Sequence, residues 1–187
     1  MEKTKILIAY GTRYGATAST IEEISKVFQG EGFEVKVANL KEEKVKDISK
    51  FELIIIGSGM RMEMWTSQAK AFLKKFSNEL KKKKVALFVS SGGRALMEHK
   101  GESDEIIRIN KKYLEDKATK YELNPISMTM FGGIWDFNQI SKIYRKFIEA
   151  EKENFIAAGF KETEPGVYDT RNWDEIRKWA NELARMI

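Results

Sequence analysis

A run of small and hydroxyl-bearing residues near the start of the chain has the composition of an anion-binding turn. It consists of Gly11, Thr12, Arg13, Tyr14, Gly15, Ala16 and Thr17, between an apolar stretch and a helical pattern. A glycine-bearing turn at a helix N-terminus leaves backbone N–H groups unpaired and aligned with the helix dipole, and threonine hydroxyls add donors. The run therefore suits a phosphate group. Capping of the helix by Thr17 or Ser19 explains the same residues equally well, and the sequence leaves both explanations open.

The spacing within this run does not match the better-known nucleotide signatures. The dinucleotide fingerprint requires glycine at three set positions, and the run G-x-x-x-x-G-K-[ST] occurs nowhere in the chain. A response-regulator site needs acidic residues at the end of the first strand to hold Mg²⁺, and residues 9–15 contain none. NAD and ATP are therefore disfavoured as ligands.

The composition disfavours several other kinds of site. The chain has no cysteine, and His99 is its only histidine, so disulfides, thiolate metal sites and multi-histidine metal sites are not expected. The net charge of +5 comes from mixed signs, and the lysine run at residues 81–84 is interpreted as a solvated turn rather than a nucleic-acid or lipid contact. No apolar run approaches the roughly 20 residues of a membrane span. We expect a cytoplasmic protein with no metal and no nucleic-acid partner.

Short apolar runs alternate with helical patterns along the first two thirds of the chain. The expected strands are residues 6–10, 35–37, 53–57, 85–90 and 126–132. The expected helices carry apolar stripes made of Ile21, Ile24, Val27 and Phe28, of Phe72, Leu73, Phe76 and Leu80, and of Ile106, Ile107, Tyr113 and Leu114. This alternation predicts right-handed crossovers and a doubly wound parallel α/β sheet, in one domain of residues 1–187.

Two more helices are expected in the C-terminal part, at about residues 137–158 and 172–186. Gly159, Pro165 and Gly166 between them predict a loop or a short extended excursion. The first of these helices has an apolar stripe formed by Ile140, Ile143, Tyr144, Phe147, Ile148 and Phe155. It is interpreted as a packed peripheral helix, and the turn at residues 132–138 is expected to form one wall of a small-molecule site.

The turn at residues 12–17 resembles the FMN phosphate loop of the flavodoxin superfamily, which has the form [ST]-x-x-G-x-T. Thr12, Gly15 and Thr17 occupy the three defining positions. The resemblance implies a five-stranded sheet in the order 2-1-3-4-5, with FMN at the carboxyl ends of the strands. It also implies that residues 12–17 hold the FMN phosphate.

The segment after the third strand resembles the menaquinone-dependent protoporphyrinogen oxidase family, a flavodoxin-like group. An I-G-x-x-x-R run from Ile56 to Arg61 is followed by an aromatic residue and a helix that contains Phe72, Leu73, Lys74 and Lys75. The resemblance implies a helix inserted after the fifth strand and electron transfer from an organic donor, such as a porphyrinogen, to a quinone.

Three loops are expected to surround the flavin ring. Ser58, Gly59, Met60 and Arg61 would bring backbone close to the ring edge, and Ser90, Ser91, Gly92 and Gly93 would line the ribityl and pyrimidine edge. Trp65 is expected either to stack on the ring or to pack on the sheet, and Arg61 either to approach the ligand or to lie on the surface. The loop after the fourth strand has no aromatic residue, so one face of the ring is expected either to be open to a substrate or to be covered by Trp135.

Three functions remain open at this point. The first is an FMN-dependent oxidoreductase with a small-molecule donor or acceptor, although the segment 134–138 lacks the arginine and tyrosine residues of the oxidase family. The second is a diffusible carrier between redox partner proteins, against which the basic net charge counts. The third, a flavin-free adaptor, is disfavoured by the intact hydroxyls of residues 12–17. The sequence leaves open whether the chain forms a homodimer or contacts a membrane surface.

Overall fold

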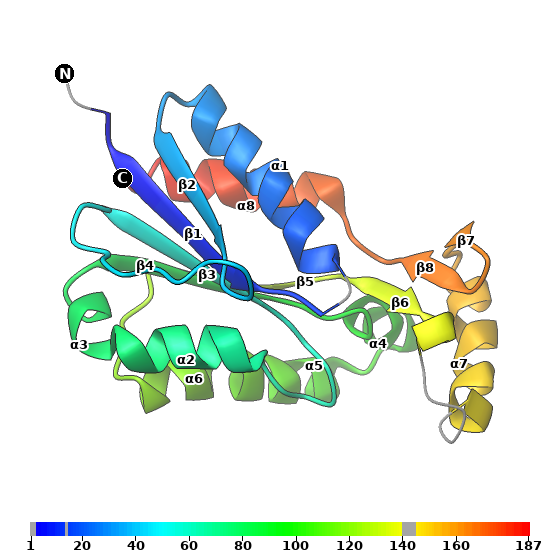
Figure 1. The fold of residues 1–187 in the computed structure, drawn as a ribbon. Helices are drawn as coiled ribbons and strands as arrows, with labels where there is room; N and C mark the ends of the chain where they lie inside the picture. Colours follow the sequence, from blue (N-terminus) through cyan, green and yellow to red (C-terminus); the bar gives the residue numbers. More distant parts are fainter. Residues whose placement is uncertain (1–2, 14, 140–144) are drawn as a thin grey trace.

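The computed structural model describes residues 3–13, 15–139 and 145–187 (Figure 1). Its main sheet has five strands in the order β2-β1-β3-β4-β5, and all neighbouring pairs are parallel. The strands are β1 (Lys5–Gly11), β2 (Glu34–Asn39), β3 (Leu53–Gly59), β4 (Lys84–Ser90) and β5 (Ser127–Phe131). The structure therefore confirms the expected fold class and strand order.

The central strands are apolar on both faces because helices cover both sides of the sheet. Every residue of β3 is buried, and Ile6, Leu7 and Ile8 of β1 are fully buried. The register places the ends of the strands side by side: Gly11 lies opposite Ser58, Gly59 opposite Ser90, and Ser90 opposite Phe131. We call this end of the sheet the carboxyl edge, and it carries the loops that were expected to form a site.

Two groups of helices sandwich the sheet. Figure 1 shows α1 (Ala16–Gly30) and α8 (Trp173–Ala184) together on one face. Their apolar side chains pack against alternate residues of β1 and β4. The opposite face carries α2 (Ser67–Lys75), α3 (Ser77–Leu80), α5 (Ser103–Asn110), the π-helix η1 (Lys111–Glu115) and α6 (Asp116–Lys120). α4 (Arg94–Lys100) follows β4. The helix expected around residues 72–80 is interrupted at Phe76, where α2 ends before α3 begins.

The segment after β5 differs from the single long helix expected at residues 137–158. It begins with β6 (Ile134–Asp136) and the 3-10 helix η2 (Phe137–Gln139), and the inserted helix α7 spans Arg145–Ala157. Residues 140–144 lie outside the described residues, so the stripe positions Ile140, Ile143 and Tyr144 are not placed. Residues 137–139 thus form a 3-10 helix where the first turn of an α-helix was expected.

The strand that pairs with β6 comes from the predicted excursion. β7 (Glu162–Glu164) and β8 (Val167–Asp169) form a hairpin whose turn contains Gly166, and β6 pairs with β8 in a small antiparallel sheet. Trp135 lies opposite Tyr168, and the two pack with Phe137 and Phe155 in a separate aromatic cluster. From here on we use the name excursion for the whole segment of residues 134–169. The aromatic cluster packs α7 against the small antiparallel sheet.

Candidate functional site

The turn after β1 leads from the carboxyl edge of the sheet into α1. Gly15 has a φ of 86°, and apart from its two chain neighbours no described residue lies within 4 Å of the position that its Cβ would take. The backbone N–H of Gly15 donates to Thr12 Oγ1 at 3.1 Å, which holds the turn together. Among the described residues no side chain caps the start of α1. Polar groups at this helix end are therefore available to a ligand.

Neither residue proposed as a helix cap performs that role. Thr17 is 1% exposed, and its Oγ1 lies 3.1 Å from the position that a Cβ on Gly59 would take. Ser19 donates to Ala16 O at 3.3 Å, inside the first turn. The capping explanation is thus not what the described residues show. Arg13 is exposed, and Tyr14 lies outside the described residues.

The turn after β3 is closed by its own side chains. Ser58 Oγ accepts from the backbone N–H of Thr66 at 3.0 Å, and Thr66 Oγ1 accepts from that of Ala69 at 3.3 Å, which caps α2. Ser58 is fully buried, so its hydroxyl serves the start of α2. A Cβ on Gly11 would lie 2.0 Å from Thr66 Oγ1, so only glycine allows β1 to pass this turn.

Residues 60–64 form a tight loop at the rim of the same edge. Met60 N–H donates to Ser90 O at 3.0 Å, and Arg61 pairs with Met64 as an isolated bridge. Met62 and Glu63 have φ values of 48° and 57°, a conformation that non-glycine residues adopt rarely. Met62 is 72% exposed. The loop places the backbone of Met60 and the exposed Arg61 at the edge.

An ion-pair network outside the sheet holds this loop. The Glu63 carboxylate accepts from Arg108 Nη2 at 2.6 Å and also from Lys112 Nζ. These hydrogen bonds, from Arg108 first and Lys112 second, lower the pKa of Glu63 to about 2. The loop is therefore attached to α5 and η1 by charged groups at neutral pH.

The placement of Trp65 corrects one sequence-based expectation. The indole is 1% exposed and packs in the core between the sheet and α2. Its Nε1 donates to the carbonyl of Tyr113 in the π-helix at 2.8 Å. A ring buried in this way has no face open to a flavin, so Trp65 packs on the sheet instead of stacking on a ligand. Its polar atom is satisfied inside the protein.

The end of β4 contains a buried polar atom with no partner. Within the described residues, Ser90 Oγ is the only buried side-chain nitrogen or oxygen that makes no hydrogen bond. Ser90 is 5% exposed and is flanked by Gly59 and Phe131 at the ends of the neighbouring strands. An unsatisfied buried hydroxyl costs about 1–3 kcal/mol, so such a position is typical of a group that meets a ligand.

The glycines after β4 and β5 let the two loops and the excursion meet. A Cβ on Gly133 would lie 2.9 Å from the backbone nitrogen of Gly92, and one on Gly92 would lie 3.6 Å from Trp135 Cδ1. Ser91 N–H donates to Phe131 O at 2.9 Å. Trp135 is half-buried, with its ring against Phe155. Ser91, Gly92 and Trp135 are thus brought together, and Gly93 immediately precedes α4.

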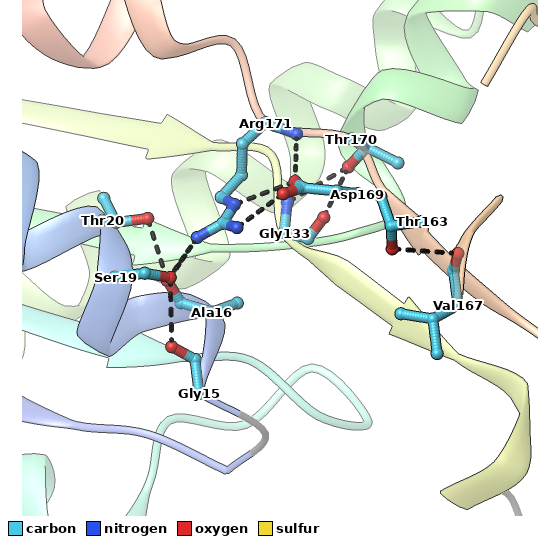
Figure 2. Close-up of polar contacts among 10 residues, drawn as sticks. All are labelled: Gly15, Ala16, Ser19, Thr20, Gly133, Thr163, Val167, Asp169, Thr170 and Arg171. Atoms are coloured by element: carbon cyan, nitrogen blue, oxygen red, sulfur yellow. Dashed lines mark hydrogen bonds and ion pairs between the residues drawn. The ribbon is translucent and has the colours of Figure 1, made fainter. Parts of the chain in front are cut away.

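Two arginines near this edge were not identified from the sequence. Arg94 donates to Met130 O and to Glu175 Oε1, the latter at 2.8 Å, and so connects the loop after β4 to β5 and α8. Burial disfavours its charge, but hydrogen bonding and charge from Glu175 outweigh that effect and raise the pKa of Arg94. Arg171 connects the excursion to the first turn of α1 (Figure 2). Both join segments far apart in the chain, so local spacing gives no signal for them.

Lysines of the basic run have partners within the protein. Lys81 pairs with Glu122, Lys83 donates to the carbonyls of Ser49 and Phe51, and Lys84 lies near Glu52. The run is therefore part of a surface turn with partners in the protein. In the described ranges, no cluster of three or more acidic or histidine side chains could hold a metal ion. No helix there is long and apolar enough to span a bilayer.

A family comparison matches most of the chain. The model of the family described as "Flavodoxin domain" matches residues 7–155, from β1 into α7. No curated protein shows a significant match to the chain.

Solved structures share the fold at low sequence identity. Rubredoxin oxygen:oxidoreductase from Desulfovibrio gigas has a TM-score of 0.57 and 15% identity, over 98% of this chain and 36% of that one. A flavodoxin from the domain Archaea has a TM-score of 0.55 and 14% identity, over 98% of each chain. A flavodoxin from Streptococcus pneumoniae TIGR4 has a TM-score of 0.54 and 13% identity, over 98% of this chain and 100% of that one. The chain spans only about a third of the first of these proteins, and at such identities the likeness shows the fold alone.

Proposed function

Because the chain belongs to the flavodoxin domain family, we propose that it binds FMN at the carboxyl edge and transfers electrons through it. The observation that carries this proposal is the turn after β1. In the part of the chain that the structure describes, no side chain caps the helix that follows this turn, and only chain neighbours of Gly15 come within 4 Å of the position of a Cβ there. A phosphate there would accept from backbone N–H groups at the positive end of the helix dipole.

The residues of the edge fit the remaining parts of FMN. The phosphate would be held by residues 12–17, with Thr12 at one end of the turn. The close approach of Gly59 to the first loop allows backbone near the flavin ring, as does the backbone of Met60. The unpaired hydroxyl of Ser90 would meet a polar atom of the ligand. Bound FMN would supply the redox chemistry, and the protein would orient the ring and set its surroundings.

We further propose a small organic electron acceptor of the quinone type. The loop after β4 carries small residues, and half-buried Trp135 lies next to Gly92. Trp65 and Trp135 were the two tryptophans expected to contact the flavin ring. Because Trp65 is buried in the core, Trp135 is the one left beside the loop after β4. A flat acceptor would then approach between the loop and the excursion. A porphyrinogen donor has less support, since Ile134, Trp135 and Asp136 offer no cation to a polycarboxylate.

A diffusible carrier that docks on redox proteins is the second candidate. It is supported by flavodoxins that match the chain over nearly their whole length. The net charge of +5 would then select an acidic partner protein.

The first experiment measures the cofactor directly. Purified protein should show the visible absorption of an oxidised flavin, and the flavin released by denaturation should be FMN. Riboflavin lacks the phosphate and should bind far more weakly than FMN. Equal affinities for the two would exclude phosphate binding by the turn after β1. Failure to bind either flavin would exclude the proposal as a whole.

The second experiment separates the two candidates. The chemically reduced protein is mixed with a soluble quinone analogue or with a cytochrome, and reoxidation is followed by absorbance. The enzyme proposal predicts a faster reaction with the quinone than with the cytochrome, and a quinone reaction slowed by Trp135→Ala. A quinone rate no greater than that of free FMN, together with a rapid protein partner, would favour the carrier.

A further inference from the structure

Arg171 is a buried arginine between the excursion and the last helix. It lies two residues after the end of β8 and two residues before the start of α8. Its side chain is only 5% exposed, although arginine is among the residues least often buried without a partner. Figure 2 shows the guanidinium between Asp169 on one side and the first turn of α1 on the other.

Asp169 fixes the orientation of this guanidinium. Arg171 Nε donates to Asp169 Oδ1 at 2.8 Å, and Nη2 donates to Oδ2 at 2.5 Å. The backbone N–H of Arg171 donates to the same carboxylate at 3.0 Å. Such a bidentate pair holds the guanidinium plane in one geometry. The guanidinium carbon also lies 4.4 Å from the centroid of the Trp173 ring, which covers its face.

The remaining nitrogen of Arg171 contacts the beginning of α1. Nη1 donates to Ala16 O at 3.1 Å and to Ser19 Oγ at 2.5 Å. Ala16 is the first residue of α1 and directly follows Gly15, whose N–H is held by Thr12. Arg171 therefore holds the first turn of α1, which directly continues the loop expected to bind phosphate. The two contacting residues, Ala16 and Arg171, are 155 positions apart in the sequence.

The other end of this connection is attached to the sheet. Thr170 lies between Asp169 and Arg171. Its backbone N–H donates to Gly133 O at 2.9 Å, and its hydroxyl accepts from Gly133 N–H at 3.1 Å. Asp169 itself lies opposite Ile134 in the small sheet. Asp169 and Arg171 are thus anchored to the loop after β5 and reach across to α1.

We propose that Asp169 and Arg171 are positioning residues for the phosphate site, because they hold the first turn of α1 in the shape that presents residues 12–17 to the ligand. This inference rests on the proposed binding of FMN. The carboxylate of Asp169 neutralises the guanidinium, so the pair acts through geometry and not as a free positive charge near the phosphate. It also couples the excursion to cofactor binding.

The chain offers a matched control for this pair. Arg177 of α8 donates to Glu23 of α1 at 2.8 Å, so it also connects the C-terminal segment to α1. Glu23 lies two turns along α1 from Gly15, and no described contact of Arg177 reaches the first turn. Loss of any arginine contact between the C-terminal segment and α1 should therefore have the same effect in Arg177→Met and Arg171→Met, whereas loss of positioning of the first turn of α1 should appear only in Arg171→Met.

The test compares the release of FMN and riboflavin from loaded protein. Dissociation constants are taken from the fluorescence of flavin released on dilution, and folding is checked by circular dichroism and thermal unfolding. Arg171→Met should weaken FMN binding about tenfold, the effect of losing one charge-assisted hydrogen bond at the turn, and leave riboflavin binding unchanged. Arg177→Met should change neither affinity.

Two conservative variants distinguish positioning from charge. Asp169→Asn releases the guanidinium from its counter-ion. If Asp169 positions Arg171, this variant should weaken FMN binding, but if Arg171 attracts the phosphate as a cation, it should strengthen FMN binding. Arg171→Lys keeps the charge but cannot form the bidentate pair and the α1 contacts together, so it should resemble Arg171→Met. Tighter FMN binding by Asp169→Asn, or wild-type binding by Arg171→Lys, would overturn the inference.

The possible failures are distinguishable. If the wild-type protein does not prefer FMN over riboflavin, the phosphate site fails and the positioning role is overturned with it. If the wild-type protein prefers FMN and all three variants of the pair keep that preference, only the positioning role is overturned. A fall in unfolding temperature without a change in the FMN-to-riboflavin ratio would also overturn it, because the pair would then serve stability alone.

Discussion

Two turns at the carboxyl edge lead from a strand into a helix, and they satisfy the helix start in opposite ways. Thr66 caps α2 after β3, and Ser58 in turn holds the backbone N–H of Thr66. The turn after β1 has no side-chain cap within the described residues and leaves open space beside Gly15. Both turns contain glycine and hydroxyl residues. The two turns therefore differ in whether a hydroxyl caps the helix, because Thr66 caps α2, whereas Thr12 accepts from Gly15 N–H inside its own turn. Glycine and hydroxyl residues thus indicate a ligand site where the start of the helix is left without a side-chain cap.

The largest effect is expected from a substitution at the point where the two turns touch. A Cβ at position 11 would overlap Thr66 Oγ1, so Gly11→Ala should lower the free energy of unfolding by about 3 kcal/mol or more. Gly15→Ala meets no neighbouring atom and should lower it by only about 1–2 kcal/mol, because alanine is strained at positive φ. Urea unfolding of both variants measures the difference. Equal losses would mean that the turns do not contact each other as described.

A paired substitution sharpens the contrast between a ligand hydroxyl and a capping hydroxyl. Thr12→Ala should weaken FMN binding about tenfold to a hundredfold, since hydrogen bonds to a charged group contribute roughly 1.5–3 kcal/mol. Thr66→Ala removes the cap of α2 and should lower the free energy of unfolding by about 0.5–2 kcal/mol. The FMN-to-riboflavin affinity ratio should change only in the first variant. A ratio that changes equally in both would remove the distinction between the turns.

Ser90 provides a smaller test, because its hydroxyl is buried and unpaired in the absence of ligand. Ser90→Ala should raise the free energy of unfolding of the flavin-free protein by about 1 kcal/mol, since it removes an unsatisfied polar atom. The same variant should weaken flavin binding about fivefold if the hydroxyl bonds to the ligand. Denaturant unfolding and flavin titration measure the two effects. A variant that is both less stable and unchanged in affinity would contradict this role.

The smallest effect is expected from the ion pairs that hold residues 60–64. The pKa of Glu63 is lowered in the folded protein from 4.5 to about 2, so the pairs stabilise the fold above pH 4.5 and this contribution is lost as the pH falls towards 2. Because the side chain is 37% exposed, solvent screens the pairs and the contribution should be under about 1 kcal/mol. Glu63→Gln should remove this part of the acid dependence. Unfolding curves at pH 6 and pH 3 would show it, and identical pH dependence in both proteins would exclude it.

The parallel sheet could be predicted from the sequence, because the pattern that specifies it is local. Buried runs such as residues 53–57 and helical stripes such as Ile21 and Ile24 alternate along the chain, and this order forces parallel strands with crossovers. The strand order came from the resemblance to flavodoxins and agrees with the structure. The turn at residues 12–17 was also recognisable, because its residues are consecutive.

The roles of individual side chains at the carboxyl edge could not be predicted from the sequence, because they depend on contacts between distant segments. Trp65 was as consistent with stacking as with packing, and its burial depends on Tyr113, which is 48 residues away. The excursion became partly a sheet because Trp135 meets Tyr168, and Arg171 reaches Ala16 across 155 residues. Contacts over such separations leave no periodic or spacing signal in the chain. These contacts form only when the sheet brings distant segments to the same edge. The residues that position a site are therefore harder to predict from sequence than the consecutive residues that form its loop.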